Sequence, residues 1–125
     1  MDRPEISVAG PDARLASLAG ELIALAQQRL GVLPEGRLGF DHAVAVVDAA
    51  VSGLDDLSRR ADCPDQANRW LVDWRDRLGS YLHAARALAD VRIDTDVSRH
   101  LLHRGVDDIG LAIALIRWEG VSARF

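Results

Sequence analysis

The stretch WLVDWRDRLGSYLHAARALA, residues 70–89, decides the fold class of this chain. When residues are placed at 100° intervals, nine of its apolar side chains fall within a sector of roughly 120°. This spacing predicts an amphipathic helix with one buried face. Pro64 suits the first turn of such a helix, so we expect it to span about residues 64–90. The predicted buried residues are Trp70, Leu71, Trp74, Leu78, Tyr81, Leu82, Ala85, Leu88 and Ala89.

Three further segments carry the same period, and glycine, proline and aspartate separate them. We predict helices over about residues 12–30 and 41–61, and a last helix from the 91–96 turn to about residue 119. Segment 31–39 holds three glycines and a proline, and it is the longest loop that we expect. Asp41 would cap the helix that follows this loop.

Each of these helices has its own apolar stripe, which we expect to be buried. The first stripe contains Leu15, Leu18, Leu22, Ile23, Leu25, Ala26 and Leu30. The second contains Val44, Val47, Ala50, Val51 and Leu54. The last contains Val97, Leu101, Leu102, Val106, Ile109, Ala112, Ile113 and Ile116.

Four helices of similar length with short connections predict an all-α, four-helix antiparallel bundle. We expect one bundle domain over residues 12–125, preceded by a short flexible N-terminal arm, residues 1–11. A chain of 125 residues with 49% hydrophobic and 27% charged residues is globular rather than disordered.

Charge and composition exclude several function classes. The formal net charge of −4 provides no positive field that would gather DNA, so we expect no DNA binding. All 15 basic residues are arginine, which suggests a GC-rich bacterial genome. The single cysteine, Cys63, excludes an intrachain disulfide framework and is interpreted as an incidental thiol. The sequence has neither a membrane-length apolar run nor a signal-peptide pattern, so we expect a cytoplasmic protein without membrane contact.

A metal-like pattern lies in the last predicted helix. Asp96, His100, His103 and Asp107 are spaced four, three and four residues apart, so their side chains stack on one helix face. Imidazoles and carboxylates are ligands for first-row metals. The same wheel places all four on the polar face, whereas metal sites in bundles project inward. A metal-binding bundle that uses these residues is therefore an alternative to a solvated face, and we expect no cofactor.

A second polar pattern borders the apolar stripe of the second predicted helix. Asp41, Asp48 and Asp55 recur at heptad spacing. We predict that these carboxylates pair with arginines of a neighbouring helix, such as Arg75 or Arg77. The alternative is a polar site inside the bundle.

The third pattern is Arg77 followed six positions later by His83. An arginine and a histidine at this spacing in a small helical bundle resemble the signature of HEPN domains. The resemblance implies RNA cleavage, or support of a nucleotidyltransferase partner, with Arg77 binding phosphate and His83 acting as acid or base. Leu78 stands where the family usually has a polar residue, and six helical steps separate the two side chains by about 120°.

Other residues have simpler interpretations. Trp70, Trp74 and Tyr81 lie on the apolar sector, so we expect core packing rather than base stacking. Gly105 and Gly110, inside the last helix, indicate a close helix–helix contact or a bend.

The sequence therefore favours a non-catalytic bundle that binds a protein partner or a second copy of itself. Such a chain would act as an adaptor, an accessory subunit, or an antitoxin-like or immunity-like factor. Apolar residues outside the core stripes would cover the partner, or would pack against loops and the arm. These residues are Val46, Leu57, Trp118 and Phe125. The alternatives are HEPN-like RNA processing through Arg77 and His83, and metal binding through His100 and His103.

Overall fold

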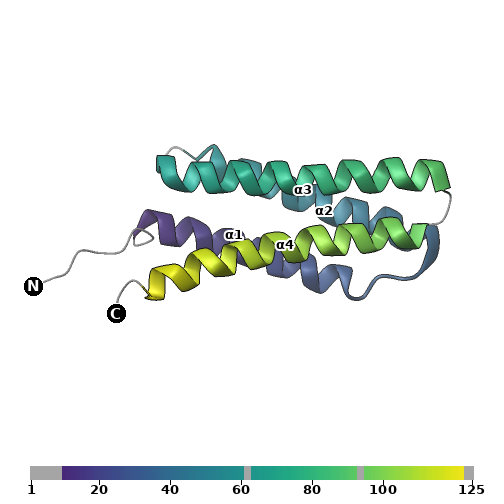
Figure 1. Ribbon diagram of the computed structural model, residues 1–125, viewed down its shortest axis with the longest axis horizontal. Helices are drawn as coiled ribbons and strands as arrows, with labels where there is room; N and C mark the ends of the chain where they lie inside the picture. The colour runs from purple at the N-terminus through teal and green to yellow at the C-terminus, as the bar shows by residue number, and fades with distance from the viewer. Residues whose placement is uncertain (1–9, 61–62, 93–94, 123–125) are drawn as a thin grey trace, which may run out of the picture.

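The chain folds into four helices that run alternately in opposite directions and pack as a bundle (Figure 1). The computed structural model describes residues 10–60, 63–92 and 95–122, without the side chains of residues 11, 92 and 117–122. The helices are α1 (Pro11–Leu30), α2 (Gly36–Ser58), α3 (Asp65–Arg92) and α4 (Thr95–Ser122). The predicted all-α four-helix bundle is confirmed. Residues 1–9 of the predicted N-terminal arm lie outside the described residues.

Each helix packs against the next one along the chain, and α4 packs against α1 to close the ring. Of the two diagonal pairs, α2 and α4 contact each other more extensively than α1 and α3. All four helices contribute large, fully buried side chains to one hydrophobic core, as the apolar stripes predicted. These side chains include Ile23, Val47, Leu54, Leu71, Leu78, Leu102, Val106, Ile109 and Ile113.

Helix α2 begins five residues earlier than the sequence predicted. Gly36 has a φ of 80°, a backbone conformation that suits glycine, and it leads the chain directly into the helix. Gly39 is buried, and a Cβ atom added to it would lie 1.6 Å from the carbonyl oxygen of Pro34. Gly39 therefore allows the loop to pack closely against the helix. It does not interrupt α2. Asp41 does not cap α2; it lies inside the helix and pairs with Arg37 at 3.2 Å.

The other end of α2 is also earlier than predicted, at Ser58. The Nδ2 atom of Asn68, in α3, donates a hydrogen bond of 2.7 Å to the carbonyl oxygen of Ser58. Carbonyl groups in the last turn of a helix have no partner within the helix, so this bond stabilises the end of α2 at that position.

Two glycines of α4 make close contacts with neighbouring helices. A Cβ atom at Gly105 would lie 2.6 Å from Cγ of Tyr81 in α3. At Gly110 it would lie 3.0 Å from Nε2 of Gln27 in α1. The prediction that these glycines allow a close helix–helix contact is therefore confirmed.

Two residues that the sequence placed in the core are exposed instead. Val97 is 49% exposed and Leu25 is 46% exposed, because each lies at the outer border of its apolar stripe. Across the described residues, none of the helices has the length and apolar character needed to cross a bilayer.

Candidate functional site

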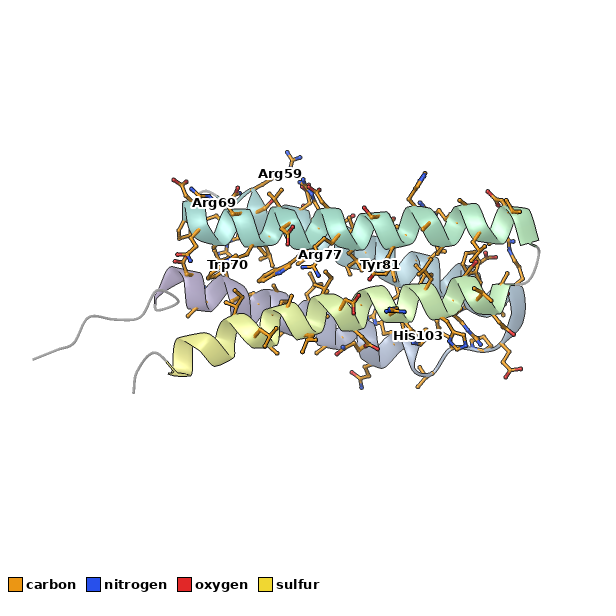
Figure 2. The ribbon with its side chains drawn as sticks, viewed as in Figure 1. Arg59, Arg69, Trp70, Arg77, Tyr81 and His103 are labelled. Atoms are coloured by element: carbon orange, nitrogen blue, oxygen red, sulfur yellow. The ribbon has the colours of Figure 1, made fainter. Side chains whose placement is uncertain are left out.

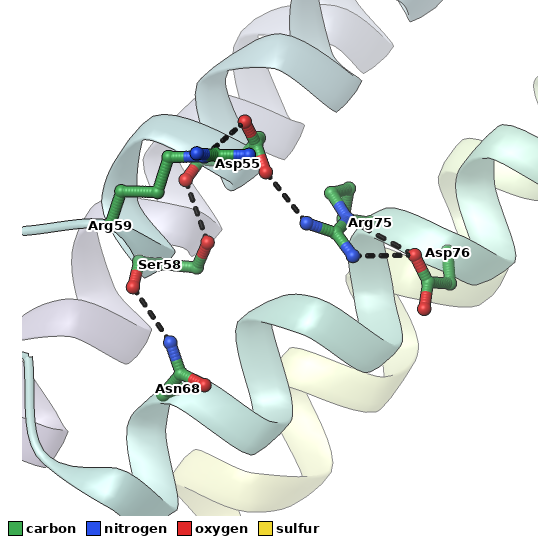
Figure 3. Close-up of polar contacts among 6 residues, drawn as sticks. All are labelled: Asp55, Ser58, Arg59, Asn68, Arg75 and Asp76. Atoms are coloured by element: carbon green, nitrogen blue, oxygen red, sulfur yellow. Dashed lines mark hydrogen bonds and ion pairs between the residues drawn. The ribbon is translucent and has the colours of Figure 1, made fainter.

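A polar network joins α2 to α3 on one side of the bundle (Figure 3). Asp55 of α2 accepts a hydrogen bond of 2.6 Å from Arg75 of α3 and one of 2.8 Å from Arg59. Arg75 also donates two bonds, of 3.0 and 2.9 Å, to Asp76. The hydrogen bond from Arg75 is the main reason that the pKa of Asp55 lies below its ordinary value. The predicted pairing of a boundary aspartate with Arg75 is therefore present.

A shallow depression lies beside this network, and it is open to solvent. Its lining residues are Val51, Arg75, Asp76, Gly79, Ser80 and His83. The guanidinium of Arg75 is already shared by two carboxylates, and the Ser80 hydroxyl donates to the carbonyl oxygen of Asp76 at 3.1 Å. Catalytic pockets usually exclude water, whereas this depression is open to solvent, and the charge of Arg75 is already neutralised by Asp55 and Asp76. The depression therefore does not resemble a catalytic pocket.

Arg77 and His83, the HEPN-like pair, lie on different sides of α3. Arg77 is drawn beside Tyr81 on the side that faces α4, and it pairs with Asp73 at 3.4 Å (Figure 2). His83 lines the depression together with Val51 of α2. The structure does not bring the arginine and the histidine to a common surface.

The two aspartates of the metal-like pattern have partners on different elements. Asp96 lies 3.7 Å from the guanidinium of Arg99. Asp107 accepts a hydrogen bond of 3.1 Å from Gln27 of α1. These two carboxylates are therefore engaged separately and do not converge on a common point.

The two histidines of that pattern differ in environment. His100 is exposed, whereas His103, labelled in Figure 2, is half-buried. Burial lowers the pKa of His103, and the positive charge of Arg99 lowers it further. In the described part of the chain, no three His, Cys, Asp or Glu side chains are grouped so that they could hold a metal ion.

The seam between α3 and α4 contains a tyrosine–aspartate contact. The hydroxyl of Tyr81 donates a hydrogen bond to Oδ2 of Asp108, and this bond raises the pKa of Tyr81. Trp70 stacks on Trp74 with ring centroids 6.2 Å apart. Trp74 is buried in the core as predicted, whereas Trp70 and Tyr81 are half-buried.

The outward surface of α4 carries apolar side chains that are not among the predicted functional residues. Leu111 is 61% exposed and Leu115, one turn later, is 50% exposed. They belong to a set of six positions spaced four, three, four, three and four residues apart, which we call the outer stripe. The outer stripe consists of Val97, Leu101, Arg104, Asp108, Leu111 and Leu115. This spacing was present in the sequence and becomes visible once the core residues of α4 are set aside.

The surplus apolar residues that the sequence did single out have other positions. Val46 and Leu57 are half-buried and pack against the core. The side chains of Trp118 and Phe125 lie outside the described part of the structure. Among the described residues, the strongly exposed apolar side chains of α4 are therefore Val97, Leu111 and Leu115.

Comparison of the chain with protein families, with curated proteins and with solved structures gives no match. The evidence for function is therefore the chemistry of these surfaces.

Proposed function

We propose that this chain is a non-catalytic helical bundle that binds a protein partner through the outer stripe of α4. The observation that carries this proposal is the exposure of Leu111 and Leu115, 61% and 50%, at adjacent turns of one helix. Single exposed apolar residues are common on protein surfaces, but neighbouring ones on a regular face are typical of interaction sites. Adaptors, accessory subunits and antitoxin-like or immunity-like factors all act in this way.

The energetics of the two leucines favour an interface. Full burial of a leucine side chain contributes about 1.5–3 kcal/mol relative to an exposed one. Arg104 and Asp108 lie in the same stripe and supply polar groups that would orient a partner. An apolar contact accompanied by oriented charges is the usual composition of a specific interface.

The alternative functions receive less support from the geometry. RNA processing would need Arg77 and His83 to act on one substrate, but they lie on different sides of α3. Metal binding would need His100 and His103 to share ligands, but Asp96 and Asp107 have separate partners.

The test is native mass spectrometry of the protein purified gently from its own host. We expect the wild type to carry a stoichiometric protein chain and Leu111→Glu to lose it, because a buried carboxylate without a partner opposes association. Leu38→Glu is the matched control, since Leu38 is 59% exposed but lies in α2. Both variants should keep the wild-type melting temperature to within a few degrees.

Two results would contradict the proposal. One is a wild-type protein that carries no bound chain under any gentle condition. The other is equal retention of the bound chain by Leu111→Glu and Leu38→Glu, which would place the interface away from α4.

A further inference from the structure

The outer stripe of α4 has the same pattern in both directions along the helix. Val97 and Leu115 lie equally far from position 106, and so do Leu101 and Leu111. The charged pair, Arg104 and Asp108, is also centred on position 106, with opposite signs on the two sides. We infer that the partner is a second copy of this chain, with the two α4 helices packed antiparallel about a two-fold axis beside position 106.

This inference rests on the proposed function and names the partner that binds at the same surface. The five steps of the outer stripe average 3.6 residues, the period of the α-helix, so the stripe stays on one face of α4 over its whole length. From Val97 to Leu115 the helix rises about 27 Å, so the stripe offers five turns of contact. A single helix from another copy would match its full length.

In the antiparallel arrangement, each position of the outer stripe faces a position of matching chemistry on the other copy. Val97 would contact Leu115 of the partner subunit, and Leu101 would contact Leu111 of the partner subunit. Both contacts are apolar, and three of these four side chains are about half exposed in the single chain. Leu101 is half-buried and already packs against the core, which gives the contact a rigid base.

The charges at the centre provide the complementarity. Arg104 is exposed and makes no ion pair within the described part of the chain. Asp108 receives the Tyr81 hydroxyl on Oδ2, so its other carboxylate oxygen remains for the partner's Arg104. A two-fold axis would form this ion pair twice, once on each side of position 106.

The same charges oppose a parallel arrangement. Parallel packing in register would place Arg104 against Arg104 of the partner subunit, and Asp108 against Asp108 of the partner subunit. Like charges in contact disfavour an interface, and a polar pair within an apolar seam fixes register and orientation. Among the side chains that the structure describes, the other strongly exposed apolar residues occur singly in separate elements, so none of them forms a comparable stripe. These residues are Leu25, Val32, Leu38 and Val91.

The first experiment measures the self-association of the purified recombinant chain by analytical ultracentrifugation over a wide concentration range. We expect a monomer–dimer equilibrium, and we expect Leu111→Glu to raise the dimer Kd by at least about tenfold. Leu25→Glu, at a residue 46% exposed on α1, is the control that leaves the Kd unchanged. A wild type that stays monomeric at every concentration overturns the inference.

Charge variants test the central pairs. Arg104→Asp gives each copy two acidic positions, and Asp108→Arg gives each copy two basic positions, so each variant should dimerise more weakly alone. Mixing the two variants should restore a heterodimer, because each acidic position then meets a basic one. Melting curves of both variants show whether loss of the Tyr81–Asp108 bond has unfolded the chain. Two folded variants that fail to recombine would contradict the central ion pairs.

A disulfide experiment tests the orientation, in a Cys63→Ser background. A mixture of Val97→Cys and Leu115→Cys should oxidise to a cross-linked heterodimer, because these positions meet across the axis. Neither variant should cross-link alone, since the two copies of position 97 would be about 27 Å apart along the axis. Cross-linking of each variant alone would indicate parallel helices and overturn the inference.

The two proposals fail in different ways. If the recombinant wild type stays monomeric while Leu111→Glu still releases a different protein in the host purification, only the second-copy inference is wrong. If Leu111→Glu changes neither self-association nor host binding, the proposed function is wrong as well.

Discussion

At Gly105, α4 packs directly against the Tyr81 side chain of α3. A Cβ atom there would lie 2.6 Å from Cγ and 2.8 Å from Cβ of Tyr81, and this Cβ cannot move without moving the backbone of α3. Gly79, in α3, is the opposite case, because a Cβ atom there would have nothing within 4 Å. The same substitution should therefore have opposite effects at the two positions.

We predict that Gly105→Ala lowers the free energy of unfolding by about 1–2 kcal/mol, because overpacking outweighs the gain in helix propensity. Gly79→Ala should raise it by about 0.5–1 kcal/mol, since only the propensity changes. Urea denaturation of both variants measures the difference. An equal gain in both would show that the Tyr81 ring does not rest on Gly105.

Part of this contact could be predicted from the sequence. The position of Gly105 inside a helical pattern indicated a close approach of another helix. The identity of Tyr81 as the contacting side chain could not be predicted, because it depends on how α3 and α4 are shifted along each other. The periodicity of one helix contains no information about that shift.

At the scale of elements, Asp55 and Arg75 link α2 to α3. Because Arg75 lowers the pKa of Asp55 in the folded chain, the carboxylate contributes stability above the unfolded pKa. That contribution is lost as the pH falls through the lowered folded pKa. We predict that the melting temperature of the wild type falls more than that of Asp55→Asn between about pH 6 and pH 2.

Circular dichroism melts over this pH range make the comparison. Asp56→Asn is the control, since Asp56 is the exposed neighbour of Asp55. Its melting temperature should follow that of the wild type across the range. Parallel curves for Asp55→Asn and the wild type would show that the link between α2 and α3 contributes nothing.

The elements themselves could be predicted because the apolar period repeats over several turns in each of them. The boundaries of α2 could not be predicted in the same way. Gly36 and Gly39 favoured a long loop, because glycine in a sequence does not show whether it breaks a helix or allows a close contact. In the fold, the carbonyl oxygen of Pro34 lies so close to Gly39 that a side chain would not fit there. This contact exists only when the loop is packed onto α2, so the sequence pattern does not show it.

The outer stripe was missed for a related reason. The apolar period predicts one buried face for each helix, and in α4 that face includes Val97 and Leu101. With Val97 and Leu101 assigned to the core face, Leu111 and Leu115 do not stand out as part of a second apolar face of α4. Their exposure in the folded chain separates the two faces, and the regular spacing of the outer stripe follows from that separation.

At the scale of the whole molecule, all six helix pairs are in contact and share one core. Removal of any one helix would expose buried residues of the other three. We predict that thermal unfolding is a single cooperative transition, with far-UV ellipticity and tryptophan fluorescence giving the same midpoint. A fluorescence change that precedes the loss of ellipticity would show that packing around the tryptophans is lost before the helices unfold, and would contradict a single transition.

The whole-molecule arrangement also explains why the fold was easier to predict than the function. Four amphipathic helices with short connections have few ways to bury their stripes, and the bundle is one of them. The same bundle supports many unrelated functions, so the activity depends on a few surface residues. Here these are Leu111, Leu115 and the charged pair between the two ends of the outer stripe.

The alternating direction of the four helices returns α4 to the end of the bundle at which α1 begins (Figure 1). A short linker could therefore join these two ends into a ring, and the ring could be reopened between α2 and α3 without separating any packed pair. The order of synthesis would change while the architecture stayed the same. Circularly permuted forms of this chain are thus compatible with its topology. In the proposed antiparallel dimer, two proteins fused after α4 would lie at opposite ends of the assembly.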